Sequence, residues 1–256
     1  MTRALTRTNF NRSRLIQILA DLAILDAVEP GNTFAEKLGL WVDFIKASAL
    51  SAALNAISAS PIAAKFPAQA ATQPSIADDL AGTRSVLVNS INKSLTDQAA
   101  STRTELSSEK PAVPFDVAAA YRPYRRIYLA HQREMDLAIR ALRAKVRDVL
   151  AKSSAALKNL ALLDASLDNI LRDRESKLLS TLASLLESRF AQLHQAHQQK
   201  LADAQQADQR SEWMRPGGWL AGFGAELQSV MLAELELRLQ PTVGLIEAFN
   251  NITEQA

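Results

Sequence analysis

Apolar residues recur every seven positions through two long stretches of the C-terminal half of the chain. The first series is Tyr128, Met135, Leu142 and Val149, widened by Ile139 and Val146, and the second is Leu171, Leu178 and Leu185. A seven-residue apolar repeat places one stripe along a helix and is typical of neighbouring helices with left-handed packing. Because Ser153 and Ser154 separate the two series, we expect a turn there. The pattern predicts a long antiparallel, coiled-coil-like hairpin over about residues 116–209.

Prolines and small polar residues divide the remainder of the chain. The stretch 58–75 contains Pro61, Pro67 and Pro74, which block a continuing helix, so we interpret residues 59–74 as a linker. An N-terminal helical pair is expected in residues 1–58, because Thr33 and Glu36 form a capping box. The main helical domain is expected over residues 75–256. It comprises a helix at about 75–104, the hairpin at about 116–209 and C-terminal helices at 217–253, interrupted at Pro241.

The composition favours a single secondary-structure type. Hydrophobic residues make up 48% of the chain, aromatic residues only 5%, and there are 8 glycines. Alanine and leucine, which favour helices, provide most of the apolar content, whereas the residues that favour strands are scarce. We therefore predict an all-α protein, an elongated helical bundle.

The absence of cysteine excludes disulfides, thiolate metal ligands and thiol nucleophiles. No window approaches the roughly 18 uninterrupted apolar residues of a membrane span. We expect a soluble, cytoplasmic protein.

Charge is unevenly distributed, although the formal net charge is only +2. Nine lysines and arginines fall between residues 122 and 152, whereas the chain after residue 211 is mainly acidic. Such asymmetry can draw two protomers together head to tail or attract an anionic partner. We favour a third interpretation, in which the two regions neutralise each other within one bundle.

The segment from Tyr121 to Arg133 is the best candidate for a functional surface. Arginines bind phosphates and tyrosines stack on unpaired bases, so a helix over residues 121–147 could bind nucleic acid. The alternative, which we favour, is that Tyr121, Tyr124 and Tyr128 form a packed face flanked by solvated arginines. The candidate interaction residues are Tyr121, Arg122, Tyr124, Arg125, Arg126, Arg133, Arg140 and Arg143.

Other patterns do not reach the requirements of a site. His194 and His197 are spaced for one helix face but lack a third metal ligand, so we expect a solvated polar helix end there. The glycines of the segment 216–224 follow no strand and are expected to close a turn before Trp219 and Phe223. No Ser/His/Asp set can be assembled from the three histidines. We expect no catalytic residues, no cofactor and no metal.

Several sequence blocks together resemble a bacterial family, domain of unknown function 3348. The blocks begin at Leu50 (LSAALN), Tyr124 (YRRIYLAHQREM), Leu163 (LDASLD), Leu185 (LLESRF), Pro216 (PGGWLAGF) and Leu232 (LAELELRLQPTVGLIEA). The resemblance spans nearly the whole chain, and none of its blocks is a catalytic signature. It implies a cytoplasmic accessory to an envelope-associated assembly.

Three functional hypotheses follow from these patterns. The first is a non-enzymatic helical scaffold or adaptor that associates with a protein partner or with itself through its helices. The second is a nucleic-acid-binding module that uses the basic helix. The third places the basic residues 1–28 on an anionic membrane surface.

Overall fold

The fold is that of a computed structural model, which describes residues 14–22, 51, 55, 75–108 and 115–253. Its helices are α1 (Arg14–Asp21), α4 (Ile76–Ser108), α5 (Val117–Ser153), α6 (Ala155–Ser180), α7 (Leu182–Ala204) and α8 (Trp219–Thr253), with a short 3-10 helix, η2 (Arg210–Glu212). The part of the chain that is described contains no strand. The predicted all-α class is therefore confirmed.

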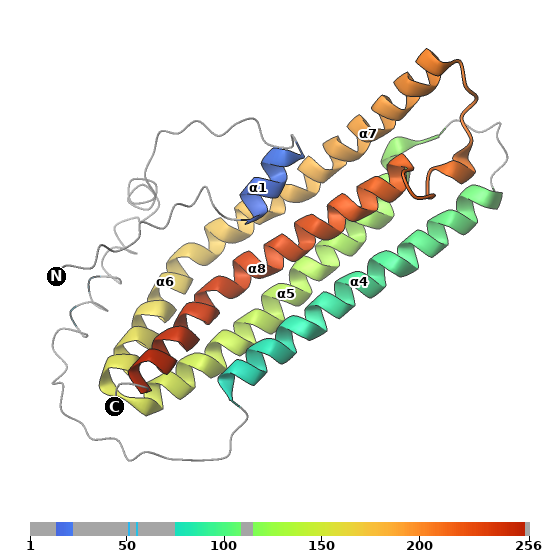
Figure 1. The fold of residues 1–256 in the computed structure, drawn as a ribbon. Helices are drawn as coiled ribbons and strands as arrows, with labels where there is room; N and C mark the ends of the chain where they lie inside the picture. Colours follow the sequence, from blue (N-terminus) through green and yellow to red (C-terminus); the bar gives the residue numbers. More distant parts are fainter. Residues whose placement is uncertain (1–13, 23–50, 52–54, 56–74, 109–114, 254–256) are drawn as a thin grey trace, which may run out of the picture.

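The long helices lie side by side as an elongated bundle (Figure 1). Helices α5 and α8 occupy its middle and pack against all the other long helices, whereas α4 lies on one side of them and α6 and α7 lie on the other (Figure 1). Helix α1 packs against α8. Each middle helix is thus covered on two sides and presents only a narrow face to solvent.

The predicted hairpin is present, and its turn lies at Ser153 and Ser154, as the sequence predicts. Helix α5 begins after Asp116, whose Oδ1 accepts a hydrogen bond of 3.0 Å from the N–H of Ala119. Helix α6 begins after Ser154, whose Oγ accepts one of 3.2 Å from the N–H of Leu157. These caps satisfy main-chain donors that have no partner within a helix, so the sequence determines both starts locally.

The second predicted series of buried leucines, Leu171, Leu178 and Leu185, is wrong at Leu178. Leu178 is 57% exposed, and its neighbour Leu179 is buried instead. Helix α6 ends at Ser180, and its buried residues are Leu157, Ala161, Ile170 and Leu179, so Leu171 and Leu178 do not lie on its core face. A straight α-helix drifts by about 20° per seven residues from a strict seven-residue repeat, and the break at Thr181 also separates Leu185 from the two earlier leucines.

The expected interruption at Pro241 is also absent, because α8 continues through this residue to Thr253. Leu239 and Leu245 on either side of the proline are buried. A proline inside a helix removes one main-chain hydrogen bond at a cost of roughly 3 kcal/mol. Burial of the apolar residues around it offsets that cost.

The glycine-rich turn before α8 behaves as predicted. Gly217 has a φ of +86°, a conformation that L side chains rarely adopt. A Cβ atom on Gly218 would lie 2.3 Å from the carbonyl oxygen of Trp213, so only glycine fits there. The turn brings Trp219 and Phe223 into the core.

Little of the predicted N-terminal pair is described. Helix α1 corresponds to its first member, with Leu15 and Leu19 buried against the bundle. The expected second helix lies outside the described residues except for Ser51 and Asn55, which are helical, and the linker at 59–74 lies wholly outside them. Among the helices described, none is long and apolar enough to cross a bilayer.

Candidate functional site

The three tyrosines of the basic segment are core residues. Tyr121, Tyr124 and Tyr128 are 2%, 4% and 0% exposed. The ring centroids of Tyr121 and Tyr124 lie 5.6 and 5.9 Å from that of Phe190. Burial raises the pKa of all three hydroxyls. Stacking on nucleic-acid bases is therefore excluded for these side chains in this fold, and the packed-face interpretation is correct.

Most arginines of the same helix point away from the core. Arg122, Arg126, Arg133 and Arg140 are exposed and, at spacings of four and seven, lie along one face of α5. Leu137 stands on this face and is 67% exposed. We call these five residues the outer stripe. Arg125 is exposed as well, next to the outer stripe in the sequence.

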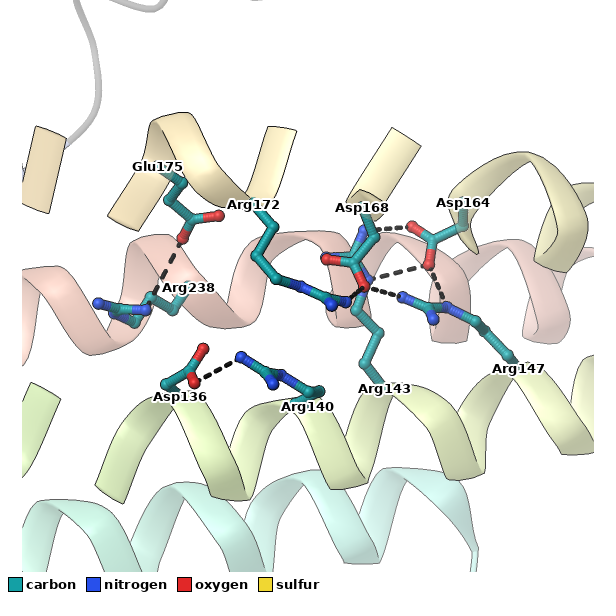
Figure 2. A network of polar contacts seen from close by, with 9 residues as sticks. All are labelled: Asp136, Arg140, Arg143, Arg147, Asp164, Asp168, Arg172, Glu175 and Arg238. Atoms are coloured by element: carbon teal, nitrogen blue, oxygen red, sulfur yellow. Dashed lines mark hydrogen bonds and ion pairs between the residues drawn. The ribbon is translucent and has the colours of Figure 1, made fainter. Parts of the chain in front are cut away.

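Arg143 differs from the other candidate residues because it is engaged inside the hairpin. Its Nε donates to Asp164 Oδ2 at 2.9 Å and its Nη1 donates to Asp168 Oδ1 at 3.3 Å. Arg147 donates to the same two carboxylates at 2.7 and 2.9 Å, and Arg172 donates to Asp168 at 2.7 Å (Figure 2). Three guanidinium groups thus share two carboxylates.

This sharing affects the titration of Asp168. Partial burial works to raise the pKa of its carboxyl, but the hydrogen bond from Arg147 and the charges of Arg143 and Arg172 hold that pKa below its usual range. Asp168 therefore stays ionised and orients the three arginines around it.

A second polar network lies deeper, between α5 and α8. Glu234 is fully buried, and its carboxylate accepts hydrogen bonds from Tyr128 at 2.6 Å, from Gln132 at 3.1 Å and from Arg238 at 2.9 Å. Gln132 also donates to the carbonyl of Leu179 at 3.0 Å, in the last turn of α6. A buried carboxylate is stable only with such partners, so the network fixes the relative positions of three helices.

A cleft of about 350 Å³ opens above this network, between α5, α6 and α8. Five arginines line it, together with four carboxylates, and they come from all three helices: Arg133, Asp136, Arg140, Arg143, Asp168, Arg172, Asp173, Glu175 and Arg238. The apolar part of the lining consists of Leu129, Met135, Ile139, Leu179 and Pro241. Partial burial raises the pKa of Glu175, against the opposing charge of Arg238.

The expected neutralisation of the basic segment by the acidic C-terminal region does not occur as proposed. The acids of α8 pair elsewhere: Glu226 with Arg189 at 2.7 Å, Glu236 with Arg84 at 2.6 Å and Glu234 with Arg238 at 2.8 Å. Of the outer stripe, Arg140 pairs with Asp136, whereas Arg122, Arg126 and Arg133 form no ion pair with any residue that the structure describes. The outer stripe therefore keeps its positive charge.

The structure brings together one set of residues that the sequence had not suggested. His131 Nε2 lies 3.0 Å from Ser94 Oγ, and its Nδ1 lies 2.8 Å from Glu134 Oε2, the order found in a hydrolase triad. Ser94 stands inside α4, where main-chain N–H groups are held by the helix, so the described backbone around it offers no donor for an oxyanion. This set is a polar contact between α4 and α5.

The histidines expected at a solvated helix end pack instead at one end of the bundle. The His194 ring lies 5.1 Å from Phe115 and 5.4 Å from Trp219, between centroids, and burial lowers the pKa of its imidazole. His197 Nε2 lies 3.0 Å from Asp208 Oδ1, which also accepts a hydrogen bond from Trp213. Within the described residues, no group of three acids or histidines is placed to hold a metal ion.

Sequence reasoning missed the carboxylate side of the cleft. Asp164 and Asp168 are spaced by four, as are Arg143 and Arg147 across the turn at Ser154, so an antiparallel hairpin pairs them. Glu234 and Arg238 are also spaced by four, but Glu226, Glu236 and Glu247 lie in the same helix, so nothing in the sequence singles out this pair. These spacings indicate a site only when it is known which helices pack against each other.

The fold and the site define an all-helical bundle protein with an arginine-rich face and a charged cleft between α5, α6 and α8. The chain belongs to the family described as "Protein of unknown function (DUF3348)", whose model matches residues 1–251. This match confirms the resemblance drawn from the sequence blocks. No curated protein and no solved structure matches the chain.

Proposed function

We propose that this protein is a non-enzymatic helical scaffold or adaptor in the cytoplasm, where it serves an envelope-associated assembly by binding an acidic helix of a partner protein. The observation that carries the proposal is the outer stripe of α5. It combines an exposed leucine with three arginines that form no ion pair with the described residues, on a helix whose opposite face is buried.

The chemistry of the outer stripe indicates the kind of partner. Leu137 offers an apolar contact at 67% exposure, and Arg133 and Arg140 lie one turn before and after it. A partner helix that carries an apolar residue flanked by Asp or Glu would match this order of groups. A second copy of the same stripe would repel, since both faces are positive.

The test is site-specific photo-crosslinking of the full-length protein in the cells that produce it. A crosslinker at Leu137 should give a discrete protein adduct whose crosslinked peptide is acidic, whereas one at Leu162, 46% exposed on α6, should not. The double variant Arg122→Glu/Arg126→Glu should abolish the adduct. The matched variant Lys93→Glu/Arg103→Glu, with the same charge change on the exposed face of α4, should retain it.

Three outcomes would contradict the proposal. They are equal adduct yields at positions 137 and 162, an adduct that survives reversal of Arg122 and Arg126, and a crosslinked peptide without acidic residues.

The second candidate function is binding of nucleic acid through the same arginines. Because the tyrosines are buried, stacking of bases on their rings is not available, and contacts of the arginines to the phosphate backbone would carry the binding. Contacts from the four arginines of the outer stripe predict that log Kd rises with log salt concentration with a slope of about 3 to 4.

Fluorescence anisotropy with a duplex DNA of mixed sequence tests this candidate. Arg122→Glu/Arg126→Glu should lower the slope by about 2, and Lys93→Glu/Arg103→Glu should not change it. Absence of saturable binding at low salt would exclude the candidate. A nuclease-sensitive adduct at Leu137 would favour it over the protein partner.

The membrane hypothesis loses part of its basis. An amphipathic helix binds a bilayer through its apolar face, and in α1 the residues of that face, Leu15 and Leu19, are buried against the bundle. The other residues of the 1–28 segment, apart from 14–22, lie outside the described residues.

A further inference from the structure

We propose that the cleft between α5, α6 and α8 is a binding site for a small molecule that bears a phosphate group. The cleft, of about 350 Å³, lies near the lower end of the range of ligand sites, which suits a small metabolite rather than a polymer. This inference goes beyond the scaffold function and does not depend on it, because the cleft includes side chains of α6 and α8 that the outer stripe lacks.

The first support is the distribution of hydrogen-bond donors. Each guanidinium carries five N–H donors and no acceptor, and five such groups line the cleft. Four carboxylates line it as well, Asp136, Asp168, Asp173 and Glu175, so the lining carries one positive charge in excess. Arg133, one of these five arginines, forms no ion pair with the described residues.

The second support is that Arg140 and Arg172 can leave their present partners for a ligand with little loss of stability. Arg140 pairs with Asp136, but their side chains are 45% and 43% exposed. A surface pair of this kind contributes about 0 to 1 kcal/mol, so a ligand can displace it. Arg172 contributes one hydrogen bond to Asp168, which keeps two other arginines if Arg172 turns to a ligand.

The third support is geometric. Arg140 extends from α5 and Arg172 from α6 on the opposite side of the cleft, towards Asp136 and Asp168 respectively, and Arg238 of α8 lies near Glu175 (Figure 2). Donors that surround a point suit a tetrahedral phosphate, whereas a carboxylate presents two oxygens in one plane. Glu175, Ser176 and Asp173 on α6 offer acceptors for the hydroxyl groups of an organic body.

The back wall is preorganised. Gln132 and Arg238 line the cleft and are both fixed by hydrogen bonds to the buried Glu234. A site whose wall is already held in place loses less conformational entropy when it binds a ligand.

Isothermal titration calorimetry on the full-length protein tests the site, with inorganic pyrophosphate as the probe and citrate as the carboxylate comparison, at constant ionic strength. One pyrophosphate should bind per chain. Arg172→Gln should weaken its affinity at least tenfold, and Arg133→Gln should weaken it to a smaller degree. The matched variant Lys177→Gln, which removes the same charge from an exposed position of α6 outside the cleft, should stay within twofold of the parent.

Three results would overturn the inference: no saturable binding of pyrophosphate, equal loss in Arg172→Gln and Lys177→Gln, or citrate binding as tight as that of pyrophosphate. Circular dichroism of Arg172→Gln controls for folding, and Arg133→Gln serves as the second variant. Neither Arg172 nor Lys177 belongs to the outer stripe, so failure here is distinguishable from failure of the partner proposal.

Discussion

At the residue scale, Glu234 shows how one buried charge can hold several helices together. The carboxylate is 0% exposed and accepts hydrogen bonds from Tyr128, Gln132 and Arg238. Its neighbour Glu236, two positions along the same helix, pairs with Arg84 at the surface, with 36% of its side chain exposed. Two chemically identical residues therefore have different energetic roles because of their surroundings.

We expect Glu234→Ala to lower the free energy of unfolding by about 3 to 5 kcal/mol, since it leaves the largely buried Arg238 without its main partner. Glu236→Ala should cost less than about 1 kcal/mol. Urea denaturation followed by circular dichroism measures both values. Similar costs for the two variants would show that the buried network does not stabilise the fold.

Asp168 gives a prediction for acid pH. Its folded-state pKa is depressed, so its contribution to stability is present above the unfolded-state pKa of about 3.9 and is lost as the pH falls through the lower folded-state value. Asp168→Asn should therefore destabilise the protein at pH 7, and the difference from the parent should shrink below about pH 4. Urea midpoints at pH 7, 4 and 3 measure it.

The control for that series is Asp148→Asn, at an exposed position of α5. Because this side chain is exposed, its replacement should change stability at pH 7 by less than that of Asp168. A difference for Asp168→Asn that stays constant down to pH 3 would contradict the role given to this carboxylate.

At the element scale, the face that α6 turns to the core decides which of its leucines are buried, and the helix is interrupted at Thr181, before α7. Two side chains of α5 donate hydrogen bonds to main-chain carbonyls on either side of the break. Gln132 donates to the carbonyl of Leu179 at 3.0 Å, and Tyr121 donates to that of Ala183 at 2.6 Å. Each of these hydrogen bonds gives a partner to a main-chain carbonyl beside the break, so the Gln132 amide and the Tyr121 hydroxyl stabilise the break.

Adjacent leucines at this break should differ sharply. Leu179→Ala should cost about 2 to 5 kcal/mol, because it leaves a cavity in the core, whereas Leu178→Ala should change stability by less than about 0.5 kcal/mol. Thermal and urea unfolding of the two variants would settle the register of α6. A larger loss for Leu178→Ala would restore the seven-residue seam that the sequence suggested.

At the scale of the whole molecule, the apolar surface of the hairpin is covered within the chain. Met135, Leu142, Val146 and Leu150 of α5 are buried among the neighbouring helices, so the heptad pattern does not require a second protomer. Among the described residues, the large apolar side chains that remain exposed are spread over several helices: Val86, Leu137, Leu162, Leu178 and Ile252.

We therefore expect the purified protein to be a monomer of 27.9 kDa. Light scattering coupled to size exclusion, at low and high salt, measures the mass. A dimer that persists at both salts would mean that these exposed apolar residues form an interface between copies. A dimer at low salt alone would indicate pairing of opposite charges.

The sequence by itself determined the helical class, the hairpin, its turn at Ser154 and the glycine turn at Gly217, and it favoured a packed tyrosine face over base stacking. These features depend on local propensity, capping and the period of apolar residues, all of which act over a few neighbouring positions. Only the tertiary structure decided that Leu179 rather than Leu178 is buried, that α8 passes through Pro241, and which carboxylates the arginines meet. Those outcomes depend on contacts between helices distant in the sequence, whose burial and charge pairing outweigh local preference.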